Sequence, residues 1–296
     1  MKVQEIEAFL AVCQYGSFTR AAEKCYTTQP NISWQIASLE KKLGHQLIVR
    51  GKGIHQFRLT KAGELFLPQA EKWLNLWRET ERILEEEGTE HYSFSCVPSI
   101  GNLILPRLFQ AFQEQAPDCI IEQSTRRSTE VCSDVEYGRT DCGIVCDTAF
   151  SRDMLIKPIA SEKIEFICRR ESRYHGVQKI SELDISKQMY MRFSNEEHAW
   201  QKRYLKLGSK KNLGNFTAIQ KPALLFTVPD AWALVPHSYL RTEFPEDEFV
   251  SYPLDVEPPR RKFLLVSQIS PRQPYYDIVY EEIRKVMAET EGFELL

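Results

Sequence analysis

The chain has 296 residues, a net charge of −3 and 43% hydrophobic residues, which is typical of a globular protein with two or more compact units. A chain of this length buries enough surface to fold without disulfide bonds. No apolar run reaches the roughly 18–20 residues of a membrane helix, and the polar, acidic N-terminus contains no signal-peptide core. We therefore expect a cytoplasmic protein with no membrane partner.

The charges are unevenly distributed along the chain. Residues 1–67 contain nine Lys and Arg against five acidic residues, whereas residues 68–90 contain three against seven. A basic N-terminal segment on an acidic body favours an anionic partner for that segment alone.

The first 44 residues predict three helices. Gly16 ends the first helix, Ser17 caps a short second one, and Thr28 caps a third that Gly44 ends. The apolar residues of the third helix share one face: Ile32, Ile36, Leu39 and Leu43. Its other face is largely polar apart from Pro30 and Trp34, so the three helices are typical of a helix-turn-helix.

Two short β-like runs follow the third helix. Residues 46–50 and 56–59 flank a Gly-Lys-Gly turn at 51–53, which predicts a hairpin, or wing. Together, the helices and the hairpin predict a winged helix-turn-helix at residues 1–60.

A long helix is expected from about residue 61 to residue 87, capped by Thr60 and interrupted or delayed by Pro68. It contains an apolar stripe with heptad-like spacing: Phe66, Ala70, Trp73, Trp77 and Leu84. Such a stripe suits pairing with another helix, so we expect self-association through this segment.

From Tyr92 onward, short apolar strands alternate with helices up to a final helix at 274–289. This alternation predicts an α/β body with a mostly parallel sheet.

Several motifs occur in family-like order: GSFTRAAE at 16–23, TQPNISWQI at 28–36, LEKKLG at 39–44 and LTKAGE at 59–64. Through them the chain resembles the LysR-type transcriptional regulators over essentially its full length. The body resembles the family's effector domain more weakly, at Ser99-Ile100-Gly101, at Leu105-Pro106 and at Gly138-x-x-Asp141.

The resemblance implies an organisation in three parts. Residues 1–60 would form the all-α winged helix-turn-helix, 61–88 a linker and dimerisation helix, and 89–296 an effector-binding domain. That domain is expected to be α/β, similar to periplasmic binding proteins, with lobe 1 at about 92–161 and 268–296 and lobe 2 at about 162–267. The implied function is sequence-specific regulation of transcription by a homodimer or homotetramer on double-stranded operator DNA.

The resemblance also implies the residues that contact DNA. The third helix would lie in the major groove and the wing against phosphate, which makes the expected contacts Thr28, Gln29, Pro30, Ser33, Trp34, Gln35, Arg50 and Lys52. Trp34 stands where many relatives have a polar or basic residue. We expect its ring to pack on a thymine methyl or sugar surface, with cover by a neighbouring subunit as the alternative.

For the effector domain, the resemblance implies a small anionic effector that contacts Ser99, Ile100 and Ser128. The alternative for Ser99 is that it only caps a helix that begins near Asn102. The two readings are compatible because a helix N-terminus also attracts anions.

No sequence pattern indicates an enzyme, a cofactor or a metal. The chain has no phosphate-binding glycine loop, no Gly-x-Ser-x-Gly and no Cys-x-x-Cys, and its six histidines show no metal-ligand spacing. The eight cysteines are most simply buried apolar residues. The alternatives to an effector-responsive regulator are a regulator that responds to a protein partner or to redox state, an enzyme, and a solute-binding protein. The missing signal peptide and the first 90 residues argue against the last.

Overall fold

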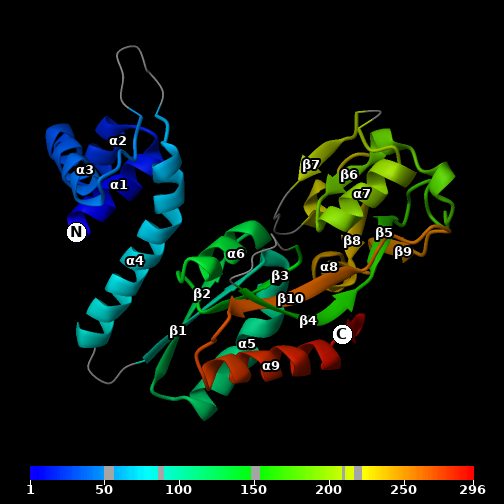
Figure 1. Ribbon diagram of the computed structural model, residues 1–296. Coiled ribbons are helices and arrows are strands. Elements are labelled where there is room, and N and C mark those ends of the chain that lie inside the picture. The colour runs from blue at the N-terminus through cyan, green and yellow to red at the C-terminus, as the bar shows by residue number, and fades with distance from the viewer. Residues whose placement is uncertain (50–56, 86–89, 148–153, 209–210, 217–221) are drawn as a thin grey trace. The chain divides into compact units, whose positions relative to one another are not determined.

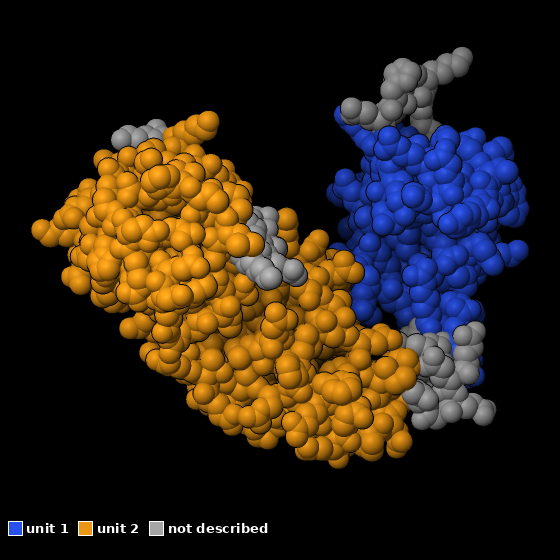
Figure 2. Space-filling view, turned by 180° about the vertical axis from the view of Figure 1, so that it is seen from behind, with its two compact units in different colours: residues 1–89, 137–139 blue, residues 90–136, 140–296 orange. Residues whose placement is uncertain are grey.

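The computed structural model describes residues 1–49, 57–85, 90–147, 154–208, 211–216 and 222–296. The chain divides into two compact units, residues 1–89 with 137–139 and residues 90–136 with 140–296 (Figure 2). Each unit has its own hydrophobic core.

The N-terminal unit begins with the three expected helices. Its helices are α1 (Val3–Tyr15), α2 (Phe18–Lys24), α3 (Gln29–Leu43) and α4 (Lys61–Glu85). Gly16 and Gly44 end α1 and α3 in the left-handed conformation, with φ of 64° and 72°. Ser17 caps α2 by accepting the Arg20 N–H. These boundaries confirm the local signals in the sequence.

The long helix α4 begins where Thr60 predicts, because the Thr60 hydroxyl accepts the Gly63 N–H at 3.0 Å. The helix runs through Pro68, so this proline does not delay it. The expected end at Gly88 lies outside the described residues. Phe66 and Ala70 pack on the core of α1 and α3, with the Phe9 and Phe66 rings 5.5 Å apart. The first half of the expected pairing stripe therefore covers this unit's own core.

The C-terminal unit has two lobes (Figure 1). Lobe 1 contains β1 (Glu90–Cys96), α5 (Pro98–Gln115), β2 (Cys119–Thr125), α6 (Ser128–Glu136), β3 (Cys142–Val145), β4 (Met154–Glu162), β10 (Arg261–Gln268), α9 (Tyr275–Glu289) and β11 (Phe293–Leu295). Lobe 2 contains β5 (Ile164–Arg169), β6 (Met189–Met191), α7 (Asn195–Tyr204), β7 (Gly214–Phe216), β8 (Trp232–Pro236), α8 (His237–Glu243) and β9 (Phe249–Tyr252), with short 3-10 turns at Ile180–Glu182, Ile185–Lys187 and Pro222–Leu225.

The sheet of lobe 1 has the strand order β11-β4-β10-β3-β1-β2. Only β1–β2 and β1–β3 are parallel, whereas β10 is antiparallel to both β3 and β4, and β11 is antiparallel to β4. The expectation of a mostly parallel sheet is therefore wrong. The reason is that β4 runs out to lobe 2 and β10 returns from it, so these two neighbouring strands have opposite directions.

Strand β10 also corrects the expected lobe boundary, because residues 261–268 belong to the sheet of lobe 1 rather than to lobe 2. One face of this sheet is covered by α5 and α9, and the other by α6 (Figure 1). Lobe 2 is built on an antiparallel three-stranded sheet, β8-β5-β9, with an apolar cluster on each face.

Candidate functional site

In the N-terminal unit, α3 presents one polar face to solvent. Ile32, Ile36 and Leu39 are buried in the core, and Leu43 packs against it. On the other face, Trp34 has 62% of its surface exposed, which confirms that its ring does not share that core. The remaining predicted contacts on α3 are exposed at the first turn (Thr28, Gln29, Pro30) or half-buried beside it (Ser33, Gln35).

The first turn of α3 is held by side-chain hydrogen bonds. The Gln29 amide donates to the Ser33 hydroxyl at 2.9 Å, and the Asn31 amide donates to Thr27 at 2.8 Å. Thr28 occupies the N-cap position, but its side chain makes no capping hydrogen bond, contrary to expectation. The Thr28 hydroxyl is exposed, so it is available to an external partner such as a phosphate oxygen.

The base of the wing follows α3. Ile48 and Leu59 form an antiparallel bridge, and the Val49 N–H donates to the Arg58 carbonyl at 3.0 Å. The tip at 50–56, with Arg50 and Lys52, lies outside the described residues. The Glu40 carboxylate accepts the Leu47 and Ile48 N–H groups at 2.9 and 3.1 Å. Glu40 therefore ties the wing to α3, a role that no local sequence pattern indicates.

A buried carboxylate links α1 to α3. Glu5 is 1% exposed and accepts from Ser38 at 2.6 Å, from the Lys42 ammonium at 2.6 Å and from the Lys2 N–H at 2.8 Å. Burial by itself raises the pKa of Glu5, but these hydrogen bonds outweigh it and hold the pKa at about 2.

This pair predicts acid sensitivity of the N-terminal unit. Because the pKa of Glu5 falls from 4.5 to about 2 on folding, the stabilisation is complete above pH 4.5 and is lost as the pH falls towards 2. Glu5→Gln should cost about 1–2 kcal/mol at pH 7. Hydrogen exchange in α1 and α3, compared with wild type at each pH, measures this loss.

The matched control for this prediction is Glu23→Gln, at an exposed position of α2. The control should leave exchange in α1 and α3 unchanged. If Glu5→Gln and wild type show the same protection at pH 7, the ion pair contributes nothing to stability.

In the C-terminal unit, a cleft of about 390 Å³ lies at the carboxyl ends of the parallel strands β1, β2 and β3. In open α/β sheets, ligands bind at this edge. The first turns of α5, α6 and α7 all contribute to its lining, and the first backbone N–H groups of a helix lack acceptors within the helix. The lining residues are Val97, Pro98, Ser99, Arg127, Ser128, Thr129, Cys146, Asp147, Arg192, Phe193, Asn195, Tyr239 and Arg261.

Ser99 lies in the first turn of α5, because the helix begins at Pro98 rather than near Asn102. It is therefore not the cap of that helix. The Arg261 guanidinium donates from Nη2 to the Ser99 hydroxyl and from Nε to the Cys146 sulfur at 3.1 Å. Its Nη1 lies 3.3 Å from the Glu162 carboxylate.

Arg261 and Glu162 are 2% and 0% exposed, so this ion pair is buried at the floor of the cleft. The Glu162 carboxylate also accepts the Ser238 N–H at 2.9 Å. Arg261 Nη1 has no hydrogen-bond partner among the described residues, although it faces Glu162. Sequence reasoning missed both residues, since each one only borders a predicted strand and no local pattern marks it.

Ser128 begins α6 and lines the cleft, and its contact with an effector stays a prediction. Its hydroxyl oxygen accepts the backbone N–H groups of Cys146 and Asp147 at 3.1 and 3.4 Å, and its own proton stays available for an acceptor. Ile100 is different, because its side chain is fully buried in the core of lobe 1 and does not line the cleft. The prediction that Ile100 contacts an effector is wrong for this side chain, which the helical turn directs at the sheet.

The charges of the cleft favour an anion. Arg127, Arg192 and Arg261 line it, and the one lining carboxylate, Asp147, accepts the backbone N–H of Asn195 at 2.9 Å. Asn195 begins α7, so this bond also joins the two lobes across the cleft. Glu162 compensates the charge of Arg261. The guanidinium groups of Arg127 and Arg192, together with three helix N-termini, make the site electropositive.

Most cysteines are buried, as expected. Burial raises the pKa of Cys142 to about 12 and of Cys96 and Cys168 to about 11, which keeps these thiols protonated at neutral pH. Cys25 is exposed, which the sequence did not indicate. None of the described cysteines is in a disulfide.

Two kinds of feature are absent from the described parts of the chain. They contain no helix long and apolar enough to cross a membrane. They also contain no group of three or more His, Cys, Asp or Glu side chains arranged to hold a metal ion.

Family models match both units. Residues 3–64 match the bacterial regulatory helix-turn-helix proteins of the lysR family, and residues 85–288 match the LysR substrate binding domain. The HTH-type transcriptional regulator EstR of Acinetobacter baylyi is 23% identical over 301 residues, which are 97% of each chain.

Solved structures share the fold over the full length. Full-length CbnR in complex with its target DNA matches with a TM-score of 0.61 and 20% identity over 97% of this chain and 100% of that one. A full-length OxyR variant from Pseudomonas aeruginosa matches with a TM-score of 0.60 and 19% identity, over 96% and 95% of the two chains. At these identities the likeness is one of fold.

Proposed function

Because the chain belongs to the LysR family of bacterial helix-turn-helix regulators, we propose that it binds an operator through α3 and the wing, and that a small anion in the cleft of the C-terminal unit modulates this binding. The exposed polar face of α3 supports the first part. The wing residues Arg50 and Lys52 are proposed to contact phosphate.

The observation that carries the second part is the convergence of three arginines and three helix N-termini on one cleft. Ser99 and Ser128 supply hydroxyl groups at its edge, and Arg261 supplies a buried guanidinium at its floor. A carboxylate matches this set, because guanidinium and backbone N–H groups bind carboxylates with strong, charge-assisted hydrogen bonds.

The effector proposal is tested by thermal unfolding of the full-length protein with acetate, succinate or benzoate, against chloride at equal ionic strength. A bound effector at 100 times its Kd adds about 2.7 kcal/mol of stability. Ser99→Ala should weaken the response about tenfold, because Ser99 holds Arg261 in place and can itself donate to the ligand.

The control is Ser186→Ala, which lies outside the cleft. If every anion in a broad panel leaves the melting temperature unchanged, the regulator responds to a protein partner or to redox state instead. If an effector is found and Ser99→Ala binds it normally, the assignment of Ser99 is wrong.

We further propose that the protein self-associates through α4. Away from the side that covers its own core, α4 exposes Leu65, Leu76 and Leu84, with exposed fractions of 68%, 64% and 73%. The rings of Trp73, which packs against that core, and of the partly exposed Trp77 stack with their centroids 5.8 Å apart. Exposed apolar surface of this extent is typical of an interface.

Light scattering should give at least a dimer at micromolar concentration. Leu76→Glu should dissociate this dimer, whereas Gln69→Glu should not. A monomeric wild-type protein contradicts the proposal.

A further inference from the structure

One stretch of lobe 2 contains positive charges only. Residues 198–229 contain six Lys and Arg and no Asp or Glu, whereas residues 91–197 contain 13 against 16 and residues 230–296 contain 7 against 13. The rest of the C-terminal unit is therefore acidic. The six cations are Lys202, Arg203, Lys206, Lys210, Lys211 and Lys221, of which Lys210 and Lys221 lie outside the described residues.

The four described cations lie at the end of α7 and just after it. Lys202 and Arg203 are in the last turn of the helix, and Lys206 follows its C-cap residue. Lys211 is five residues further along, so its Cα lies at most about 18 Å from that of Lys206. All four residues are exposed. We call Lys202, Arg203, Lys206 and Lys211 the basic surface of lobe 2.

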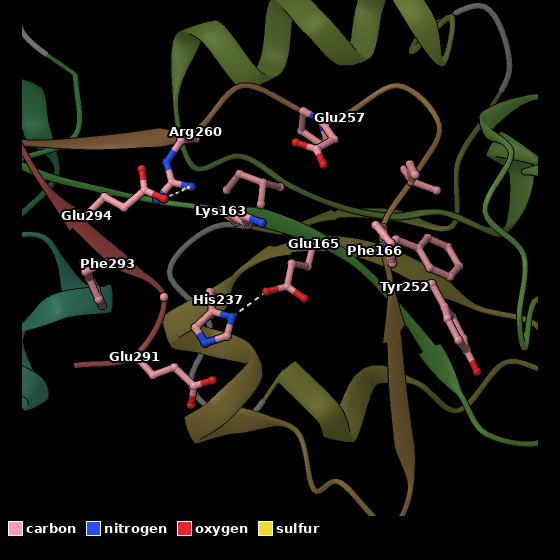
Figure 3. Close-up of a pocket in the computed structure, with 15 residues that line it drawn as sticks. Lys163, Glu165, Phe166, His237, Tyr252, Glu257, Arg260, Glu291, Phe293 and Glu294 are labelled. Carbon is pink, nitrogen blue, oxygen red and sulfur yellow. Dashed lines mark hydrogen bonds and ion pairs between the residues drawn. The ribbon is translucent and has the colours of Figure 1, made fainter. Parts of the chain in front are cut away.

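The charges of the basic surface have no counter-charge. None of its four side chains forms an ion pair or a hydrogen bond with a described residue. Other arginines of this unit have carboxylate partners, as Arg241 has in Glu291 at 2.8 Å. Figure 3 shows one such pair where the lobes are joined, Arg260 with Glu294 at 3.2 Å. The basic surface therefore attracts an anionic partner from outside the chain.

The helix dipole accounts for part of this surface only. A helix C-terminus favours cations in its last turn, which suits Lys202 and Arg203. Lys206, however, has a φ of 55°, a left-handed conformation that usually belongs to glycine after a helix. Neither this lysine nor Lys211 is explained by the helix, and the dipole does not explain why 32 residues contain no carboxylate.

The composition of the basic surface favours phosphate groups over a protein. Three of its four cations are lysines, and lysine is depleted in protein interfaces, whereas it binds the phosphates of nucleic acids readily. The Arg203 guanidinium lies 5.2 Å from the centre of the Tyr204 ring, which is itself 5.4 Å from that of Trp200. This contact holds the guanidinium beside the lysines.

We propose that the basic surface of lobe 2 binds the phosphate backbone of the DNA that α3 holds. The inference rests on the proposed binding of an operator through α3, which brings a dense array of phosphates to the protein. Phosphate contacts are independent of base sequence, so this surface adds affinity without adding specificity.

Charge reversal in the full-length protein tests the proposal. Lys202→Glu/Lys206→Glu should weaken binding to an operator with flanking DNA by about tenfold or more, and lower the slope of log affinity against log salt by about two. A scrambled duplex of equal length should show the same loss. The neutral variant Lys202→Gln/Lys206→Gln should lower the slope equally, which separates a lost contact from a folding defect caused by glutamate at the helix end.

The matched control is Lys163→Glu/Lys179→Glu, which changes the net charge equally at exposed lysines outside the basic surface. It should leave the slope unchanged. In hydroxyl-radical footprinting, wild type and Trp34→Ala should protect backbone positions in the flanking DNA that Lys202→Glu/Lys206→Glu leaves open.

Three outcomes would overturn the proposal. The charge-reversed variant binds both duplexes like wild type, or the control weakens binding equally, so that net charge alone explains the effect. In the third, the variant binds DNA normally but loses its effect on transcription in vitro, which assigns the surface to an acidic protein partner. If wild type instead binds operator and scrambled duplex alike and the variant loses both, the proposed operator recognition fails and this inference holds.

Discussion

Replacing Arg261 with methionine is expected to destabilise the C-terminal unit by about 3–5 kcal/mol, because the substitution leaves the Glu162 carboxylate buried without its cation. Glu162 is fully buried, and among the described residues it then keeps the Ser238 N–H as its one hydrogen-bond donor. Urea unfolding of the full-length protein, followed by hydrogen exchange in β4 and β10, measures the loss.

The control is the double variant Glu162→Met/Arg261→Met. Replacing a whole buried ion pair with apolar side chains is often neutral or stabilising, so the double variant should regain most of the lost stability. It should still fail to bind the anionic effector, because the guanidinium at the floor of the cleft is gone. A loss of less than about 1 kcal/mol in the single variant would show that the buried ion pair contributes little to stability.

Replacing Trp34 with alanine is expected to cost about 1–3 kcal/mol of operator affinity and little affinity for random DNA, if the ring packs on a thymine methyl. Trp34 is 62% exposed and lies outside the apolar cluster of the N-terminal unit, so its removal leaves no cavity. Binding isotherms on an operator selected from a random library and on a scrambled duplex measure the ratio of the two affinities.

Arg50→Ala is the matched comparison, because losing a phosphate contact weakens binding to both duplexes alike. It should lower the slope of log affinity against log salt by about one. Trp34→Ala should instead leave that slope unchanged. If Trp34→Ala dissociates the oligomer or unfolds the N-terminal unit while the ratio of the two affinities stays the same, Trp34 is a structural residue.

The sequence predicted the N-terminal unit well because its signals are local. A glycine in the left-handed conformation ends α1 and α3, a hydroxyl caps α2 and α4, and an apolar stripe gives the buried face of α3. Each of these signals acts within one or two helical turns. Even here, sequence reasoning missed the carboxylates of Glu5 and Glu40, whose partners lie in other elements.

The sheet of lobe 1 was harder to predict because strand direction is a tertiary property. Strand β4 contains Pro158, and a proline within a run of residues argues against predicting a strand there. The register between β4 and β10 shifts beside this proline. With β4 missing from the prediction, nothing indicated that β10 returns antiparallel between β3 and β4. The error in the lobe boundary has the same origin.

By itself, the sequence determined the helices of the N-terminal unit and the polar face of α3, because turn chemistry and side-chain periodicity depend on near neighbours along the chain. The two serines at the edge of the cleft came from the family resemblance. Only the tertiary structure decided that Arg261, 162 residues from Ser99, donates to it, and that Ile100 faces the core. The physical reason is that an ion pair or a cavity depends on which strands lie side by side. Which strands pair depends on how apolar surface is buried over the whole unit, and this information is not present in any short segment.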